Sequence, residues 1–190
     1  GFIDFDELTS GLQPNALIVI GARPGMGKTS FAMGMAGHAA IEEQRPVLFF
    51  SLEMSRVELS QRLLCSEARV DSQKVRNGRL TDDDWSRISH AIGRMGEAPL
   101  WIDDNPNVTV MEIRAKARRL QSRIGPLGMI VVDYIQLMSG NARAENRQTE
   151  VAEISRGLKI LARELQCPVV ALAQLNRGLE QRADKRPMLS

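Results

Sequence analysis

Cysteine and histidine are scarce in this sequence, and their positions exclude a clustered metal or redox site. The two cysteines, Cys65 and Cys167, lie far apart and match no metal-binding or redox spacing. The two histidines, His38 and His90, are also far apart and have no ligand companions, whereas a metal site needs several clustered ligands. We expect both thiols to be core residues in a reducing compartment, and both histidines to be structural or surface residues.

Long apolar runs and an excess of one charge are absent too. No stretch approaches the ~20 apolar residues that a membrane span needs, and no signal peptide is recognised at the start. The 25 basic and 23 acidic residues give a formal net charge of +2, so any binding of nucleic acid must come from a local patch. With 43% hydrophobic residues, the composition is that of a globular domain. We expect a cytoplasmic protein without membrane contact.

Both ends of the sequence indicate a domain excised from a longer protein. The first residues lead almost directly into the folded part, and residues 175–190 are polar and contain no closing helix or strand. The length of 190 residues suits one domain with a sizeable core. We therefore expect residues 1–190 to form one domain, incomplete at its C-terminal end.

The most informative stretch is glycine-rich and spans residues 22–29 (ARPGMGKT). It follows an apolar run at 16–20 and precedes a segment rich in helix formers, which is the strand–loop–helix context of a Walker A motif. Glycines let successive backbone N–H groups curl into an anion-binding nest, and the N-terminus of the helix adds its dipole. The alternative is a glycine-rich turn that caps an ordinary helix, since Ala22 stands where the strict pattern has glycine.

The motif predicts a nucleotide site with named roles. Lys28 is placed to reach the β- and γ-phosphates, and the Thr29 hydroxyl to bind Mg²⁺. The predicted nucleotide-binding residues are Arg23, Pro24, Gly25, Met26, Gly27, Lys28, Thr29 and Ser30.

Apolar runs without alternation predict strands buried on both faces, at residues 16–20, 47–52, 99–104, 129–133 and 169–174. Helical patterns separate them, three of which begin with a predicted capping box: Ser55 with Glu58, Thr81 with Asp84, and Thr109 with Glu112. Strands that alternate with helices imply an α/β fold, a mainly parallel sheet flanked by helices on both faces.

Two of these helices carry further predictions. In the helix after Thr81, the 3.6-residue spacing predicts an apolar inner stripe of Trp85, Ile88, Ile92 and Met95. The helix after Thr109 has a basic outer face, which we interpret as solvated surface; its residues are Arg114, Lys116, Arg118, Arg119 and Arg123.

Polar residues follow three strands besides the glycine-rich loop, and ligands of parallel sheets bind at the carboxyl ends of strands. Asp133 has the form of a Walker B aspartate that binds Mg²⁺ through water or steadies Thr29; the alternative is a strand-end cap. Glu53 is placed to act as the general base for the attacking water, and the alternative is an ordinary surface glutamate. Gln174 is placed to sense the γ-phosphate.

Four motifs in this order resemble the ATPase domain of the bacterial replicative DNA helicases, the DnaB family of RecA-like motors. They are residues 22–29, 50–54 (FSLEM), 131–138 (VVDYIQLM) and 173–177 (AQLNR), the last continuing through 180–187. The resemblance covers nearly the whole chain. It implies a RecA-like P-loop NTPase with ATP and Mg²⁺ as cofactors, Lys28, Glu53 and Gln174 as catalytic residues, and Thr29 and Asp133 as metal-binding residues.

The resemblance also implies an activity and partners. Family members form a homohexameric ring that hydrolyses ATP between subunits, moves 5′ to 3′ on single-stranded DNA, unwinds duplex at the replication fork, and works with a primase and a helicase loader. Loops at 139–149 and 176–190 are expected to face the channel; their candidate DNA-binding residues are Arg143, Arg147, Arg177, Arg182, Lys185 and Arg186.

The family's N-terminal collar domain, the C-terminal end of its motor and its trans-acting arginine finger have no counterpart in residues 1–190. We therefore expect the isolated chain to bind nucleotide but to hydrolyse it slowly. Two alternatives stay open, another RecA-like DNA-dependent ATPase of recombination or repair, and a loading module that ATP switches without translocation.

Overall fold

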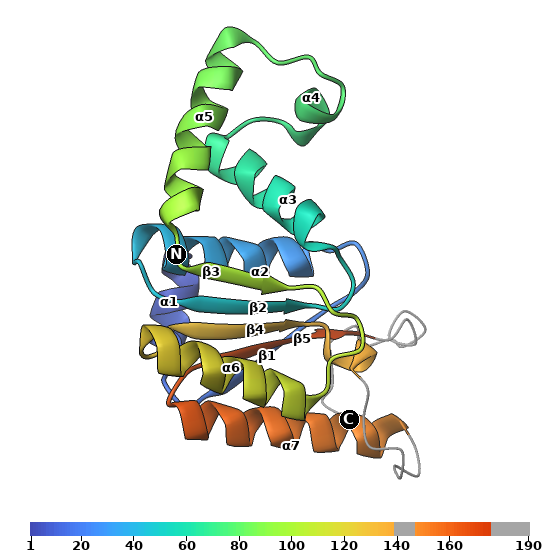
Figure 1. Ribbon diagram of the computed structural model, residues 1–190. Coiled ribbons are helices and arrows are strands. Elements are labelled where there is room, and N and C mark those ends of the chain that lie inside the picture. The colour runs from blue at the N-terminus through green and yellow to red at the C-terminus, as the bar shows by residue number, and fades with distance from the viewer. Residues whose placement is uncertain (139–146, 176–190) are drawn as a thin grey trace.

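The computed structural model describes residues 1–138 and 147–175. Its centre is a sheet of parallel strands in the order β1-β5-β4-β2-β3 (Figure 1). The strands are β1 (Leu17–Ala22), β2 (Val47–Ser51), β3 (Leu100–Asp103), β4 (Met129–Asp133) and β5 (Val169–Gln174). Every residue of β2 and β4 is buried, as expected for strands covered on both faces. The predicted α/β fold with a parallel sheet is confirmed.

Helices cover both faces of this sheet (Figure 1). One face carries α6 (Val110–Ile124) and α7 (Arg147–Leu165), and the other carries α2 (Lys28–Gly37), which continues as a π-helical turn, η1 (His38–Glu42). Successive side chains of a strand point to opposite faces. Phe50 therefore packs in the cluster under α6 and α7, whereas Phe49 packs in the cluster under α2.

The N-terminal helix α1 (Ile3–Thr9) and its N-cap residue Phe2 contact α2 through aromatic rings. The ring of Phe2 stacks on that of Phe31 with centroids 4.7 Å apart, and Phe5 meets the same ring edge-on at 5.6 Å. Phe2 also lies over Gly34, where an added Cβ would come within 3.1 Å of the Phe2 ring. These contacts join the start of the chain to α2.

A helical subdomain projects beyond the sheet (Figure 1). It has its own small apolar core, formed by Ala68, Val70, Ile88 and Ala91. All three predicted capping boxes, those of α3, α5 and α6, are confirmed. The subdomain comprises α3 (Arg56–Ala68), α4 (Ser72–Arg76) and α5 (Asp82–Glu97).

The predicted inner stripe of α5 is wrong at two positions. Ile88 is buried, but Trp85 is 56% exposed and Ile92 is 55% exposed. Because α5 stands clear of the sheet and packs chiefly along α3, only a narrow stripe of its surface is covered.

The basic face of α6 is largely exposed, as interpreted, and several of its side chains also form ion pairs. Arg114 and Arg118 form ion pairs with Glu164 of α7, and Lys116 forms one with Asp103 of β3. These side chains link α6 to its two neighbours, because the carboxylates lie beside it.

The two cysteines are buried and free, as predicted for core residues. Burial raises the pKa of both thiols, that of Cys167 to about 12. Among the described residues, no helix combines the length and the apolar character that crossing a membrane requires.

Candidate nucleotide-binding site

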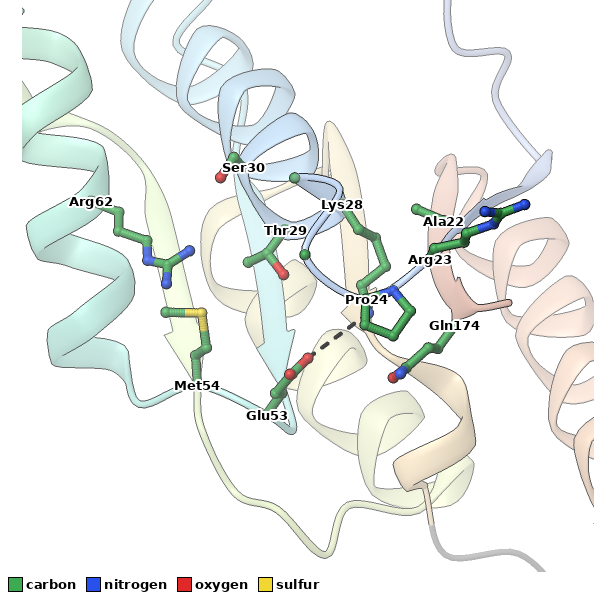
Figure 2. A pocket seen from close by; sticks show the side chains of 12 residues that line it. Ala22, Arg23, Pro24, Lys28, Thr29, Ser30, Glu53, Met54, Arg62 and Gln174 are labelled. Atoms are coloured by element: carbon green, nitrogen blue, oxygen red, sulfur yellow. Dashed lines mark ion pairs between the residues drawn. The ribbon is translucent and has the colours of Figure 1, made fainter. Parts of the chain in front are cut away.

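A pocket of about 340 Å³ opens at the carboxyl ends of the strands (Figure 2). Its walls come from four parts of the chain: the glycine-rich loop with the first turn of α2, the segment after β2, helix α3, and the end of β5. The lining residues are Ala22, Arg23, Pro24, Gly25, Gly27, Lys28, Thr29, Ser30, Glu53, Met54, Arg62 and Gln174.

The loop has the backbone geometry that its glycines allow. Gly25 and Gly27 adopt φ values of 75° and 81°, in the left-handed region that side chains with a Cβ disfavour. Gly27 is also the N-cap of α2 and offers no side-chain cap. The first N–H groups of α2 therefore lack a capping side chain from this position, which is the arrangement that suits an anion.

Lys28, Thr29 and Asp133 form the polar centre of the site. The Lys28 Nζ atom lies 2.9 Å from Asp133 Oδ1, and the Thr29 hydroxyl donates a hydrogen bond of 2.6 Å to Asp133 Oδ2. Asp133 is fully buried. The prediction that Asp133 steadies Thr29 therefore has its geometric counterpart here.

Two further groups surround the Lys28 ammonium. Its Nζ atom lies 3.9 Å from Glu53 Oε2 and 3.9 Å from the centroid of the Tyr134 ring. A cation over an aromatic face is electrostatically favoured. Burial, together with the nearby charges of Glu53 and Asp133, raises the pKa of Tyr134, so the phenol is neutral beside the lysine.

The donor set suits a magnesium ion that arrives with a nucleotide. Asp133 Oδ1 is buried and makes no hydrogen bond, although the Lys28 ammonium is near. Within residues 1–138 and 147–175, no group of three or more histidine, cysteine, aspartate or glutamate side chains is placed so that it could hold a metal ion by itself. Mg²⁺ commonly binds through one or two protein oxygens, with phosphates and water completing its octahedron. Thr29 and Asp133 fit that role.

Glu53 and Gln174 reach the same pocket from different strands (Figure 2). Glu53 follows β2, and its side chain is 52% exposed. The turn behind it is held by Ser51, whose hydroxyl donates to the Met54 carbonyl at 2.7 Å and accepts from the Met54 N–H at 3.2 Å. Gln174 ends β5, in register with Ala22 of β1.

Other predicted site residues lie elsewhere or outside the described part. Met26 is 71% exposed and does not line the pocket. Arg147 opens α7, and its side chain is outside the described structure. The remaining candidate DNA-binding residues fall outside the described residues; they are Arg143, Arg177, Arg182, Lys185 and Arg186.

The sequence reasoning missed three residues of this region. Arg62 of α3 lines the pocket, and a cation two turns into the helix after Glu53 was the available signal. Tyr134 covers Lys28, and its peptide bond to Asp133 is cis. Gln136 contacts Gln174, and no local pattern indicated that contact.

Comparisons with known proteins agree with this geometry. The family model of the DnaB-like helicase C-terminal domain matches residues 1–190. The chain is 54% identical over 190 residues to a replicative DNA helicase, DnaB, of Leifsonia xyli, and 51% identical over 191 residues to that of Geobacillus stearothermophilus. It covers 41% and 42% of those two proteins, so it spans about two fifths of their length.

Solved structures show the same likeness. A structure of a DnaB-like replicative helicase and its interactions with primase superposes with a TM-score of 0.93 at 36% identity, over 100% of this chain and 46% of the other. A second solved structure, of an ATPase domain, also gives a TM-score of 0.93, at 35% identity, over 100% of this chain and 67% of the other. The resemblance stated from the motifs is confirmed, as is the RecA-like architecture. The chain belongs to the DnaB-like helicase C-terminal domain family.

Proposed function

We propose that this chain is the ATP-hydrolysing motor domain of a replicative DNA helicase. The observation that carries the proposal is the Lys28–Asp133–Thr29 contact at the carboxyl ends of the strands, in a chain of this family. Phosphoryl transfer needs such groups to position the triphosphate and its metal. The relatives are named replicative helicases, which favours a motor over a recombinase or a loading module.

The proposed roles follow from position. The loop amides and Lys28 hold the phosphates, and Thr29 and Asp133 hold Mg²⁺, which would neutralise charge on the β- and γ-phosphates. Glu53, at the open side of the pocket, orients the attacking water and accepts its proton. Gln174 contacts the γ-phosphate.

Lys28 has to change partner for this chemistry. Its ammonium contacts Asp133, and we propose that it turns to the phosphates when a triphosphate enters. The Asp133 oxygen that it leaves would then be available, with Thr29, to hold the metal ion. The contact between Lys28 and Asp133 keeps both buried charges paired until that exchange, since an unpaired buried charge is costly.

The proposal extends to the whole protein. We propose a homohexameric ring in the bacterial cytoplasm that moves 5′ to 3′ on single-stranded DNA, with the collar domain, the C-terminal end of the motor and the arginine finger contributed from outside residues 1–190. Basic side chains of 139–149 and 176–190 would contact phosphates without reading sequence. A primase is a proposed partner because a structural neighbour is described with its primase interactions; a helicase loader is proposed from the family resemblance.

The decisive experiment is the ATPase rate of the longest natural form, with and without single-stranded DNA, over a salt series. We expect DNA to stimulate turnover, and the stimulation to fade as salt rises, because the DNA contacts are with phosphates. Turnover that ignores DNA at every salt concentration would favour the ATP-switched loading module. Stimulation without directional movement along the strand would favour a recombinase-like ATPase.

A further inference from the structure

The side chain of Gln136 is paired with the backbone of Gln174. Its Nε2 donates to the Gln174 carbonyl oxygen at 3.1 Å, and its Oε1 accepts from the Gln174 N–H at 3.2 Å. Gln136 belongs to η2 (Ile135–Leu137), the short 3-10 turn that follows β4. The side-chain amide of Gln136 thus satisfies both the N–H and the carbonyl group of Gln174, the last residue of β5.

This contact lies where the strand ladder has ended. β4 and β5 pair in register from Ile130 with Val169 to Val132 with Ala171. β5 runs on to Gln174, whose strand partner is Ala22 of β1 on its other side. The Gln136 amide takes the place that a further β4 residue would have in the ladder, because it offers a donor and an acceptor at peptide-like spacing.

The turn that carries Gln136 is itself well anchored. The Leu137 N–H donates to the Tyr134 carbonyl at 3.0 Å, and the Met138 N–H donates to the Ile135 carbonyl at 3.1 Å. Ile135 and Met138 are buried in the cluster under α6 and α7. The amide of Gln136 therefore has a fixed base, only three residues beyond Asp133.

We infer that Gln136 is a positioning residue that holds the end of β5 so that the Gln174 side chain faces the γ-phosphate. The inference rests on the proposed function, because it requires a triphosphate in the pocket that Gln174 lines. Gln136 lies in the turn that follows Asp133, and its side chain bonds the backbone of Gln174, so it connects the ends of the neighbouring strands β4 and β5. Gln136 touches no nucleotide in this scheme and acts only through Gln174.

Two variants separate positioning from packing. Gln136→Met keeps the approximate volume and length of the side chain and removes both hydrogen bonds to Gln174. Gln136→Glu keeps an acceptor for the Gln174 N–H but turns a carboxylate toward the Gln174 carbonyl. The matched control is Gln121→Met in α6, another half-buried glutamine, whose Nε2 donates to the Leu165 carbonyl at 3.5 Å, away from the pocket.

The full-length protein is titrated with ADP and with a non-hydrolysable ATP analogue, and its kcat is measured. We expect Gln136→Met to weaken binding of the ATP analogue by about tenfold, the scale of one lost hydrogen bond to a charged group, and to change ADP binding by less than about twofold. The kcat of Gln136→Met should fall as well. In both the affinity for the ATP analogue and kcat, Gln136→Glu should lie between Gln136→Met and the native protein, and Gln121→Met should match the native protein. Equal losses for both nucleotides, or no loss for either, would overturn the inference.

Amide hydrogen exchange without nucleotide tests the contact independently of activity. Gln136→Met should raise the exchange rate of the Gln174 amide by about tenfold or more, since that N–H loses its acceptor, whereas Gln121→Met should not. Unchanged exchange at Gln174 would overturn the inference even if turnover falls. A native protein that binds neither nucleotide would instead defeat the proposed function, and with it the role of Gln136 toward the phosphate, while the exchange result would still report whether the contact exists.

Discussion

Asp133 at the end of β4 and Asp84 in the first turn of α5 are both buried, and each contacts one lysine and one threonine. Lys28 Nζ lies 2.9 Å from Asp133, and Lys74 Nζ lies 3.0 Å from Asp84. The Thr29 hydroxyl donates to Asp133, whereas the hydroxyl of Thr81 accepts from the Asp84 N–H as part of the α5 capping box. The two carboxylates thus have similar surroundings in different parts of the molecule.

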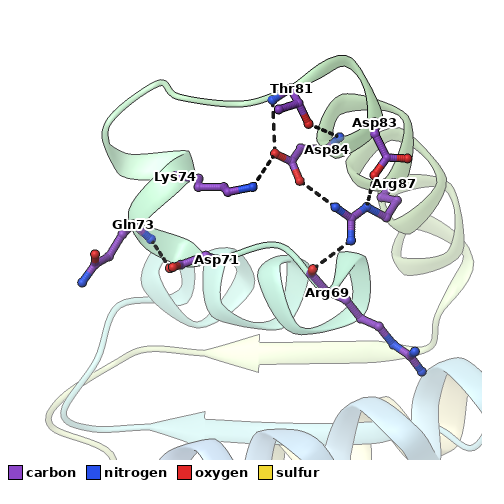
Figure 3. Close-up of polar contacts among 8 residues, drawn as sticks. All are labelled: Arg69, Asp71, Gln73, Lys74, Thr81, Asp83, Asp84 and Arg87. Carbon is purple, nitrogen blue, oxygen red and sulfur yellow. Dashed lines mark hydrogen bonds and ion pairs between the residues drawn. The ribbon is translucent and has the colours of Figure 1, made fainter.

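The two aspartates differ in how many hydrogen bonds their carboxylate oxygens accept. Figure 3 shows the contacts of Asp84. Asp84 Oδ2 accepts from the Thr81 N–H at 3.1 Å and from Lys74, and its Oδ1 accepts from Arg87 at 2.7 Å. Arg87 also donates to the Arg69 carbonyl at 3.1 Å. The hydrogen bonds with Thr81, above all that from its N–H, and the contact with Lys74 lower the pKa of Asp84 from 3.8 to about 2.

Asp133 by contrast keeps one oxygen, Oδ1, without a hydrogen bond, and the neighbour of that oxygen is the Lys28 ammonium at 2.9 Å. It lies behind Lys28 and Thr29, which line the pocket. A buried carboxylate whose bonds are all made with neighbouring residues stabilises a fold. A buried carboxylate oxygen without a hydrogen bond, next to residues that line a pocket, is a candidate ligand for a metal ion. The comparison therefore distinguishes a structural aspartate from a candidate metal-binding one by hydrogen bonding, since burial and residue type are the same.

The largest effect on ATP binding should come from replacing Lys28, with the same replacement of Lys74 as its control. We expect Lys28→Met to weaken ATP binding at least about 100-fold, because the triphosphate loses its charge partner. Lys74→Met should leave ATP affinity within about twofold, because Lys74 contacts Asp84 and does not line the pocket. Titration with a fluorescent ATP analogue measures both. Normal binding by Lys28→Met would remove the nucleotide site from this pocket.

The largest effect on turnover should come from one of two glutamates near the start of α3. Glu53→Gln should lower kcat by about 10²- to 10⁴-fold with nucleotide affinity retained, as expected for a lost general base. Glu58→Gln is the control, because glutamine also completes a capping box, and its kcat should be unchanged. Steady-state ATPase assays of the full-length protein check this. Equal kcat values for the two variants would exclude Glu53 from the chemistry.

The melting temperature should distinguish Asp84 from its neighbour Asp83, both of which form ion pairs with Arg87. Asp84→Asn should lower Tm by roughly 5 °C or more, because Lys74 and Arg87 lose a buried partner. Asp83→Asn should shift Tm by no more than about 2 °C, since Asp83 is 79% exposed and its ion pair with Arg87 is at the surface. Thermal unfolding by circular dichroism measures both, and equal shifts would show that the Asp84 hydrogen bonds are not stabilising.

The smallest expected effect is on pH dependence. Because the pKa of Asp84 is lower in the folded protein, its contribution to the free energy of unfolding is complete above its ordinary value of 3.8 and is lost as pH falls toward about 2. Asp84→Asn should make the free energy of unfolding less steep over this range. Some slope should remain, because the pKa values of Glu58, Glu112 and Glu164 are lowered as well.

Urea unfolding at several pH values between 2 and 5 gives the slope of the free energy of unfolding against pH for the native protein and for Asp84→Asn. An unchanged slope in Asp84→Asn would mean that this carboxylate titrates alike in the folded and unfolded chain.

Features governed by nearby residues could be predicted from the sequence. The run 129–133 is apolar without alternation, and it forms β4 with the same bounds. Ser55 with Glu58 forms the predicted capping box, because each partner needs only the adjacent backbone. The glycine-rich loop and the polar ends of the strands come together because parallel strands place their carboxyl ends at one edge.

Features governed by distant residues could not be predicted. Periodicity placed Trp85 and Ile92 on an inner stripe, but how much of a helix is covered depends on the partners it meets. Arg62 and Gln136 each reach the site region through tertiary packing alone. The sequence thus predicted which candidate residues lie together at one edge of the sheet, and did not predict the side chains that surround and hold them.

The stacking of Phe2 and Phe5 on Phe31 has a mechanical consequence for the phosphate loop. Phe31 lies one helical turn beyond Gly27, and its N–H donates to the Gly27 carbonyl at 2.9 Å. A force on the start of the chain therefore acts on α2 within one turn of Lys28, because the aromatic contacts connect the two segments. Movement of the N-terminal segment would therefore be transmitted to the helix that carries Lys28, which couples the start of the chain to the proposed phosphate-binding loop.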